Sequence, residues 1–430
     1  MERKCSSIYQ MSLRTITSKG TINAAKELLS YVAELGFEYV YILPVCEADR
    51  DMDKTTWSQR MMNCGLNNPA NPYKLIDFFK VDSEYGTNED LKNFIDIAHN
   101  YGLKIMLDLV YLHCGRNIYH SKDDPDFLVR DENGNIPCGN SWPFARINFK
   151  NENAREYLWS NMLYWALEYK ADGFRCDCGD MVPIDFWEEG IRRVREINPN
   201  FFMLNEGYNR ETLNHGFDLI YTDNEMITEP NSLYMIKGKI SVDEWKKRTE
   251  DEFVKSGKFI RFVENHDMAN DTADFRLEKE IGNKKMEAYI ALCYTLNGVP
   301  FVWNGNEICD TSVNCLLGNA QYGSNSIDWK KMQTLKGKRR LEVIKTLNKL
   351  RYDYPEMQNT PIHFIDSENN TIHFERHLNN DGLTAFFNFD NSECIIKNKP
   401  NMKILISNGI NVSEKEIIIE PNGYFVARYR

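Results

Sequence analysis

The feature that most constrains the fold is a regular alternation of short apolar runs with helical segments through most of the 430-residue chain. Eight runs have the length and composition of buried strands, and most precede a segment with helical spacing of apolar residues. This alternation predicts parallel strands joined by helices, as a closed (β/α)8 barrel or a long doubly wound sheet. No glycine-rich phosphate loop follows the first run, which favours the barrel. The runs lie at 37–44, 73–79, 103–110, 171–177, 200–206, 217–221, 258–264 and 299–303.

Two regions interrupt the alternation and predict further domains. Residues 114–147 are rich in Asp, Asn, Gly and Pro and predict an inserted loop domain, domain B. Beyond residue 359 the helical spacing disappears, and short apolar runs predict a C-terminal domain of antiparallel strands, domain C, over 359–430. The barrel, domain A, then comprises 1–113 and 148–358.

Helices are predicted where apolar residues recur at helical spacing. Thr87, with Asp90 three residues later, has the sequence pattern of a capping box at the start of one helix. The other main helical segments lie at 21–35, 152–169, 183–197, 242–254, 284–296 and 337–350.

Composition argues against several function classes. The formal net charge of −11 is a poor match to a nucleic-acid groove, an anionic membrane surface or an acidic substrate, and favours a neutral substrate. We find no apolar run of the about 18 residues that a membrane-spanning helix needs, and no signal peptide. The 11 cysteines are scattered along the chain as an odd set, which predicts reduced thiols in a cytoplasmic protein. The oligomeric state stays open.

Three of the predicted strands lead into an acidic residue. Asp177 and Glu206 each end a run, and Asp267 closely follows a third. Arg175 stands two residues before Asp177, so alternation along a strand puts the guanidinium and the carboxylate on one side. A neighbouring cation lowers the pKa of a carboxylate and keeps it ionised, as a nucleophile requires. Any one of these acids could instead be a helix cap or a salt-bridge partner, but three together match the needs of a barrel enzyme.

The cysteines beside Asp177 could suggest a metal site. Cys176 and Cys178 flank the acid, but we find neither a second Cys pair nor a nearby His at zinc spacing. We therefore predict no metal site among these residues.

Taken in order, the motifs resemble those of the alpha-amylase family, glycoside hydrolase family 13. The segments NPYKLIDFFKVDSEYGTNEDL around Tyr73, GVPFVWNGNE around Trp303 and SIDWKK near Trp329 also resemble parts of that family. The resemblance covers nearly the whole chain and implies a barrel with an inserted domain B and a β-sandwich domain C. The four segments similar to the family's signatures are DLVYLH at 108–113, GFRCD at 173–177, NEG at 205–207 and FVENHD at 262–267.

The resemblance implies a role for each acid. Asp177 would be the nucleophile that forms a covalent glycosyl-enzyme intermediate, and Glu206 would be the general acid and then the general base. Asp267 would bind hydroxyls of the distorted sugar ring. In this retaining mechanism the two reacting carboxyl groups lie about 5–5.5 Å apart. Like charges that close raise one pKa, which predicts a protonated Glu206 and an ionised Asp177 beside Arg175.

The resemblance also implies substrate-binding residues. His113 and His266, at strand ends, would bind hydroxyls of the cleaved sugar, although a strand-end histidine is often structural. Tyr73 would stack on the apolar face of that sugar, although core packing would also explain an aromatic ring there. Tyr208 would contribute to the leaving-group subsite, and Asp108 would orient neighbouring side chains rather than react.

Three departures from the family pattern concern metal binding and specificity. Leu112 stands where many relatives have an Asn that binds a structural calcium ion, and ARIN at 145–148 replaces a second calcium-binding element. Because calcium prefers six to eight oxygen ligands, we expect no metal or cofactor to be required, with a structural calcium ion left as the alternative. Asp180 and Met181 replace the Lys-His pair of many endo-acting relatives, which leaves exo action on short substrates open.

Three functions follow from these observations. The first is a retaining hydrolase that cleaves α-glucosidic bonds, α-1,4 in our expectation, in maltodextrins or related α-glucans. The second is a transglycosylase or a glucoside isomerase of the same family, of the trehalose or sucrose type. The third is a non-catalytic interaction protein derived from the family, against which the three acids argue. A barrel hydrolase with a phosphate site is not supported, because no glycine-rich loop follows the last strands.

Overall fold

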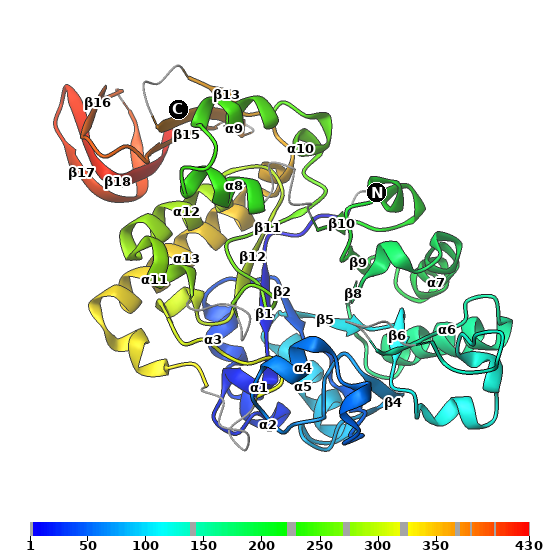
Figure 1. Ribbon diagram of the computed structural model, residues 1–430. Helices are drawn as coiled ribbons and strands as arrows, with labels where there is room; N and C mark the ends of the chain where they lie inside the picture. Colours follow the sequence, from blue (N-terminus) through cyan, green and yellow to red (C-terminus); the bar gives the residue numbers. More distant parts are fainter. Residues whose placement is uncertain are drawn as a thin grey trace.

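Eight parallel strands form the central sheet of the structure, a computed structural model (Figure 1). Their order in the sheet is β10-β9-β8-β5-β2-β1-β12-β11. A parallel bridge between Ile220 and Phe259 brings the two edge strands together, so the sheet is a nearly closed barrel, as predicted. The structure describes residues 3–137, 143–221, 229–269, 276–318, 326–365, 370–378, 381–399 and 401–429. The barrel strands are β1 (Ile8–Met11), β2 (Tyr39–Ile42), β5 (Lys104–Leu109), β8 (Gly173–Cys176), β9 (Phe202–Asn205), β10 (Leu219–Ile220), β11 (Ile260–Phe262) and β12 (Val299–Trp303).

Two of the strand assignments made from sequence need correction. The run 73–79 was predicted as the second barrel strand, but β4 (Leu75–Val81) pairs antiparallel with β3 (Cys46–Ala48) outside the barrel. The first barrel strand is instead β1, which the sequence did not reveal and which lies between β2 and β12. The predicted number of barrel strands was right only because these two errors compensate.

The helices surround the barrel, and the amphipathic ones pack their apolar faces on it. The predicted capping box is present, since Thr87 Oγ1 accepts from the backbone N–H of Asp90 and the Asp90 carboxylate accepts from that of Thr87. Two segments predicted as single helices are each broken in two, and the i→i−3 bond from Leu28 N–H to the Ala25 carbonyl shows the tightened turn at one break. The helices are α1 (Leu13–Ile16), α2 (Ile22–Lys26), α3 (Leu29–Glu34), α4 (Gln59–Asn63), α5 (Asn88–Asn100), α6 (Glu152–Leu167), α7 (Ile184–Ile197), α8 (Glu229–Ile236), α9 (Val242–Arg248), α10 (Glu252–Ser256), α11 (Leu277–Ile281), α12 (Asn283–Thr295) and α13 (Leu335–Asp353).

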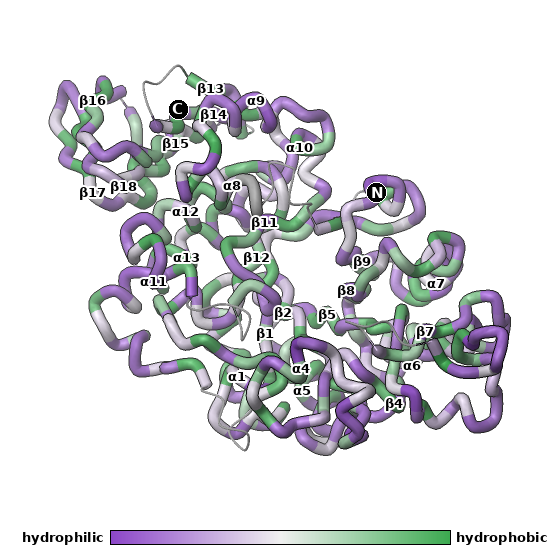
Figure 2. The backbone as a smooth tube through the Cα atoms, viewed as in Figure 1, coloured by the Kyte–Doolittle hydropathy of each residue, from purple (hydrophilic) through white to green (hydrophobic). Residues whose placement is uncertain are grey.

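The barrel strands are buried along almost their whole length, on both faces. Every residue of β1, β2, β8, β9, β11 and β12 is buried. This is the pattern of a parallel sheet covered by helices, and it explains why the strands read as continuous apolar runs. Figure 2 shows these strands as mostly hydrophobic stretches inside a shell in which hydrophobic and hydrophilic residues alternate.

Two smaller parts accompany the barrel. At the base of the predicted domain B, β6 (His113–Cys114) and β7 (Ala145–Arg146) pair antiparallel. The C-terminal part is an antiparallel sheet in which β18 pairs with three other strands, and Figure 1 shows it beside α12 at one end of the molecule. Its strands are β13 (His363–Phe364), β14 (Thr371–Leu378), β15 (Asp381–Asn388), β16 (Cys394–Lys397), β17 (Lys403–Val412) and β18 (Glu416–Tyr429).

Two general properties of the chain can be compared with the sequence predictions. None of the ten cysteines of the described ranges forms a disulfide, and Cys138 lies outside those ranges. In the part of the chain that the structure describes, we find no helix both long and apolar enough to cross a membrane.

Candidate active site

The C-terminal ends of the barrel strands bring the predicted acids to one place. Asp177 follows β8, Glu206 follows the neighbouring β9, and Asp267 comes shortly after β11. Parallel strands end at the same edge of a sheet, so side chains that follow them converge. One carboxylate oxygen of Asp177, one of Glu206 and the Sγ atom of Cys178 all lie within 4.8 Å of one another. Two acids that are far apart in the sequence are therefore direct neighbours.

The guanidinium of Arg175 lies among these acids and is fully buried. Its Nη1 donates to Asp177 Oδ1 at 2.8 Å and to both carboxylate oxygens of Asp108, at 2.9 and 3.0 Å. Its Nη2 forms an ion pair with Glu206 Oε1 at 2.5 Å. One guanidinium therefore bridges three carboxylates, including the one with which the sequence paired it.

The environment separates the acids by pKa. Burial raises the pKa of Glu206 well above its ordinary value, and the charges of Asp177 and Asp267 add to this rise while Arg175 opposes it. The sequence predicted the direction from like charges alone, and the structure adds burial as the larger cause. Burial also raises the pKa of Asp108, to about 6, against the opposing charge of Arg175. Glu206 is therefore well suited to hold a proton at neutral pH.

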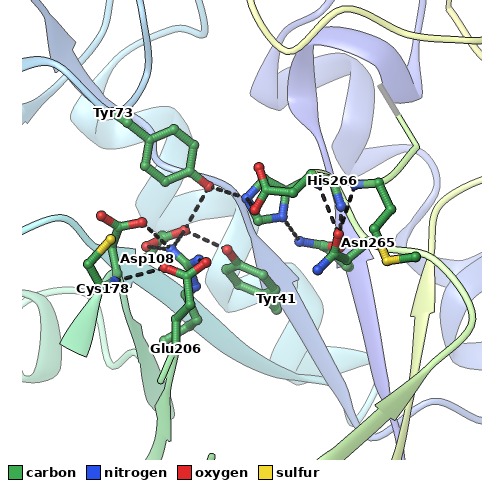
Figure 3. Close-up of polar contacts among 12 residues, drawn as sticks. Tyr41, Tyr73, Asp108, Cys178, Glu206, Asn265 and His266 are labelled. Carbon is green, nitrogen blue, oxygen red and sulfur yellow. Dashed lines mark hydrogen bonds and ion pairs between the residues drawn. The ribbon is translucent and has the colours of Figure 1, made fainter. Parts of the chain in front are cut away.

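A chain of hydrogen bonds orients His266 (Figure 3). Its backbone N–H donates to Gln10 Oε1 at 3.2 Å, so the Gln10 amide nitrogen faces the imidazole Nδ1, 2.7 Å away. Burial lowers the pKa of His266 to about 4, so the neutral ring accepts at Nδ1 and carries its proton on Nε2. Nε2 donates to the Tyr73 hydroxyl at 2.8 Å, and this hydroxyl donates to Asp108 Oδ2 at 3.3 Å. The Tyr41 hydroxyl donates to the same oxygen at 2.5 Å.

Asp267 is held by a different cation from the other acids. Arg60, on α4, donates through Nη1 to Asp267 Oδ1 at 3.0 Å, and His266 Nε2 lies 3.5 Å from Oδ2. The Asp267 side chain is 47% exposed and that of Arg60 is 19% exposed. The partial burial of the Asp267 carboxylate works against its ionisation, but His266 and Arg60 outweigh this effect and lower its pKa. The third acid is therefore ionised at neutral pH.

Two cavities meet at the acids. The smaller, of about 110 Å³, is lined by Asp177 and Tyr73 together with Glu206 and Asp267. The larger, of about 530 Å³, is lined by Glu206 and Asp267 together with Tyr208, whose side chain is exposed. The predicted residues Tyr73 and Tyr208 thus lie on opposite sides of the acids.

His113 lies deeper than the other predicted residues. It is fully buried, its ring centroid is 5.2 Å from that of Phe144, and burial lowers its pKa. Among the described residues it lines neither of the two cavities. Its binding of substrate hydroxyls therefore stays a prediction.

Asp180 orients the loop that carries Glu206. Its Oδ2 accepts from the backbone N–H groups of Tyr208 and Asn209, at 2.5 and 2.9 Å, and its Oδ1 accepts from Asn205 Nδ2 at 2.8 Å. A Cβ atom at Gly207 would lie 2.1 Å from this carboxylate, so only glycine fits between them. Asp180, which departs from the family pattern, thus holds residues on both sides of Glu206.

Sequence reasoning missed several residues of the site. Gln10 and Tyr41 are polar groups within apolar barrel strands, which is a detectable signal of a functional or structural role. Arg60 carried no such signal, because it meets Asp267 across 207 positions of the chain.

Comparison with known families gives a direct match. The family model described as alpha amylase, catalytic domain, matches residues 8–131 and 141–346 of this chain. The chain belongs to the alpha-amylase family. The match to this family includes the barrel strands and the three acids, and it leaves out residues 132–140 of the inserted segment.

Individual relatives of this alpha-amylase family chain are distant. An intracellular maltogenic amylase of Bacillus subtilis is 23% identical over 401 residues, which cover 86% of this chain and 62% of that protein. A maltosyltransferase of Picrophilus torridus, named for α-1,4-glucan and maltose 1-phosphate, is 23% identical over 405 residues, with 89% and 60% coverage. The chain thus spans about three fifths of the length of each. An alpha-amylase structure from Lactobacillus plantarum superposes with a TM-score of 0.80 at 18% identity, over 99% of this chain and 98% of that one, and supports the fold.

Proposed function

We propose that this chain is a retaining glycosidase that cleaves α-glucosidic bonds, α-1,4 in the first instance, in maltodextrins or related α-glucans. The observation that carries the proposal is the closeness of the two strand-end acids, since one carboxylate oxygen of Asp177 lies within 4.8 Å of one of Glu206. Retaining glycosidases place their carboxyl groups about 5–5.5 Å apart, whereas inverting enzymes need about 6.5–9.5 Å to fit a water molecule. The short separation favours a covalent intermediate.

The nucleophile in this proposal is Asp177. Its Oδ1 accepts a hydrogen bond from Arg175, while its Oδ2 makes no hydrogen bond within the described residues. One oxygen is therefore held in place, and the other can form a bond to the anomeric carbon of the sugar. The bond from that carbon to the glycosidic oxygen breaks as the new bond forms, which leaves the sugar esterified to Asp177.

The proton donor is Glu206. Because its pKa is raised, the Glu206 carboxyl group holds a proton that it can give to the departing glycosidic oxygen. The leaving sugar then departs as a neutral alcohol. The backbone N–H of Cys178 donates to Glu206 Oε2 at 2.8 Å and orients the carboxyl group. Once ionised, Glu206 takes a proton from water, and the resulting hydroxide attacks the anomeric carbon and releases Asp177. Two inversions give net retention of the α configuration.

The remaining residues bind the sugar in this proposal. Tyr73 presents its ring to the small cavity and stacks with His266, at a centroid distance of 5.7 Å. The ionised Asp267 accepts hydrogen bonds from ring hydroxyls and stabilises the positive charge that develops on the sugar. His266 is neutral, with its Nε2–H held toward Tyr73, so the two side chains present one fixed polar edge to the substrate.

The stereochemical outcome tests this proposal directly. Proton NMR during hydrolysis of maltotriose should show the α anomer of the new reducing end before mutarotation, and a first product in the β configuration would overturn the retaining assignment. A Glu206→Gln variant should regain activity on 4-nitrophenyl α-glucoside when azide is added and form an α-glucosyl azide. Failure of rescue in a folded variant would remove Glu206 from the acid–base role.

A second candidate function is transfer to a sugar instead of water. The cavity of about 530 Å³ on the far side of Glu206 has room for a carbohydrate acceptor, and one relative is named as a maltosyltransferase. The same glycosyl-enzyme intermediate would then yield longer or rearranged sugars. Product analysis with maltoheptaose, maltose, sucrose and trehalose distinguishes the two functions.

The proposal also covers the cellular compartment and the metal requirement of the protein. The lack of disulfides among the described cysteines and the intracellular relative support action in a reducing cytoplasm. We further propose that no metal is required, because every step is assigned to a side chain of this protein; activity after exhaustive EDTA treatment checks this. The expectation of no nucleic-acid partner stays a prediction.

A further inference from the structure

We propose that a cavity at the N-terminal ends of the barrel strands binds the phosphoryl group of a small phosphomonoester through Arg3, Arg195 and Lys258. The cavity measures about 300 Å³, and none of the three acids is part of its lining. The proposal therefore goes beyond the glycosidase function and does not depend on it. Three features support it: the position of the lining residues, their charges, and the polar groups among them that have no partner within the described residues.

The lining residues place this cavity at the end of the barrel opposite the acids. Asp218 lies directly before β10, and Lys258 lies two residues before β11. Arg3 precedes β1 and contacts Asp218, and Figure 1 shows the N-terminus next to β10. The acids follow their strands whereas these residues precede theirs, so the two sites lie at opposite ends of the parallel barrel.

The cavity carries an excess of positive charge in a chain whose formal net charge is −11. Its charged lining residues are the cations Arg3, Arg195 and Lys258 and the single acid Asp218. Three cations and one carboxylate leave a formal charge of +2 at the cavity. A phosphoryl group attached to one carbon-bound oxygen carries a charge of about −1.5 to −2 at neutral pH, so the charges of cavity and ligand match.

Asp218 is already engaged by groups of the protein. Its Oδ1 accepts from Arg3 Nη1 at 3.3 Å, and its Oδ2 accepts from Arg195 Nη2 at 2.7 Å and from the Met203 N–H at 2.8 Å. Even so, burial lowers the pKa of Arg195, and the like charge of Arg3 adds to this effect while Asp218 opposes it. One carboxylate therefore does not offset the two guanidinium groups, and a second anion would stabilise them.

Both arginines keep donors that no described residue uses. Besides the bond to Asp218, each donates through Nε to a backbone carbonyl, at 2.8 and 3.2 Å. These bonds leave Arg3 Nη2 and Arg195 Nη1 without an acceptor among the described residues. Arg195 Nη1 lies beside the lining residue Gly216, where an added Cβ atom would be 3.3 Å from it. Guanidinium groups with free N–H donors are the groups that proteins favour for phosphate.

Two further polar groups of the lining lack partners in the part of the chain that the structure describes. The ammonium group of the half-buried Lys258 forms neither a hydrogen bond nor an ion pair there. Gln358 donates through Nε2 to the Gly257 carbonyl at 3.2 Å, but its buried Oε1 accepts no hydrogen bond. A network that served stability alone would pair such groups internally, because a buried polar atom without a partner lowers stability. These groups instead fit a site for a polar ligand.

The size of the cavity leaves room for more than a phosphoryl group. At about 300 Å³ it lies at the lower end of the range of small-molecule sites, which is about 300–1,000 Å³. Leu213 and Phe217 supply apolar surface beside the charged residues. A small phosphate ester fills such a cavity, with its phosphoryl group among the cations and its carbon part on this apolar surface.

Isothermal titration calorimetry at constant ionic strength tests the site with glycerol 3-phosphate, inorganic phosphate and glycerol. Glycerol 3-phosphate is the probe because it has no sugar ring for the acids at the other end of the barrel to bind. Wild-type protein should bind one glycerol 3-phosphate per chain, inorganic phosphate more weakly and glycerol not at all. Absence of glycerol 3-phosphate binding by the folded protein would overturn the proposal, and equal or tighter binding of inorganic phosphate would overturn the assignment of an ester.

Two lysine variants locate the bound phosphoryl group. Lys258→Met should weaken glycerol 3-phosphate binding about tenfold, the change that the loss of a charge-assisted hydrogen bond of ~1.4 kcal/mol produces. Lys255→Met is the matched control, because Lys255 pairs with Glu252 and lies outside this cavity. It should bind the probe as wild type does, and both variants should keep the wild-type melting temperature without ligand. Wild-type affinity in Lys258→Met, or equal weakening in both variants, would overturn the assignment of this site.

Discussion

The molecule buries arginine in two ways, and the difference separates chemistry from architecture. At the C-terminal ends of the strands, Arg175 contacts three carboxylates. Arg376 lies on β14, where the C-terminal sheet joins the barrel. It donates to the carbonyls of Thr295, Met357 and Thr360 at 2.6–2.8 Å. Both arginines are fully buried.

The two environments act on the guanidinium in opposite directions. Burial disfavours the charge of Arg175, but Asp108 and Glu206 outweigh it and raise the pKa of the arginine. Burial lowers the pKa of Arg376 well below its ordinary value, and the nearby Arg351 lowers it further. The carboxylates thus stabilise the buried charge of Arg175 within the active site. Arg376 instead joins segments of the chain through neutral carbonyl acceptors, which do not offset the free-energy cost of burying its charge.

The largest effect is expected where the charge takes part in the reaction. Asp177→Asn removes the nucleophile but keeps the shape of the cluster, so turnover of maltotriose should fall about 10⁴-fold or more while the protein stays folded. Asp185→Asn, an exposed acid on α7 paired with Arg155, is the matched control and should keep full activity. Substantial turnover by Asp177→Asn would contradict the proposed mechanism.

The second effect should appear in stability instead of activity. Arg376→Met leaves several buried carbonyl acceptors without a donor, which should lower the free energy of unfolding by about 3 kcal/mol in chemical denaturation. His377→Ala, an exposed neighbour on β14, should change it by less than about 0.5 kcal/mol. Equal stability of the two variants would mean that the carbonyl cluster does not hold the junction.

A buried acid without an arginine contact supplies the converse case. Glu307 accepts from the Tyr9 hydroxyl at 2.8 Å and from the Gly305 N–H at 2.7 Å, and burial raises its pKa to about 7. The folded state then holds this proton more tightly than the unfolded state, so stability falls as pH rises from 4.5 to 7, by up to about 1.4 kcal/mol per unit. Glu307→Gln should flatten this part of the curve of unfolding free energy against pH, and an unchanged slope would contradict the assignment.

The smallest effect concerns the alkaline limb of activity. This limb should follow deprotonation of Glu206, whose pKa is raised by burial and in part by the charge of Asp267. Asp267→Asn removes that charge, so the limb of the residual kcat/KM on maltotriose should move down by about half a pH unit. A limb that stays in place or moves up would show that Asp267 does not act on Glu206 through its charge.

Much of the architecture could be predicted because local pattern and function coincide. Strands β8, β9 and β11 are buried along their whole length and flanked by helices, so their apolar runs and the acids after them stood out. β1 was missed because IYQM is short and carries Gln10, a polar residue that serves His266. Residues 73–79 were misassigned because an apolar run does not reveal its pairing partner, which here is the antiparallel β3.

The residues of the active site were also predictable only where local sequence sets their geometry. Arg175 and Asp177 were predictable as a pair because two positions along a strand fix their geometry. Arg60 and Asp267 meet only because α4 folds over the strand ends, and no local pattern encodes that contact. Local geometry could therefore be predicted, whereas contacts across the barrel opening could not.

A small apolar cluster lies apart from the barrel core, and it has a consequence for how such an enzyme could change. Trp57, Met61, Phe144 and Leu317 pack apart from the barrel core, so this corner can be rebuilt without disturbing the strands that hold the acids. Libraries restricted to these four positions should yield folded proteins that keep the arrangement of the acids. This corner of the molecule would then be a part that selection can alter while the catalytic chemistry is inherited unchanged.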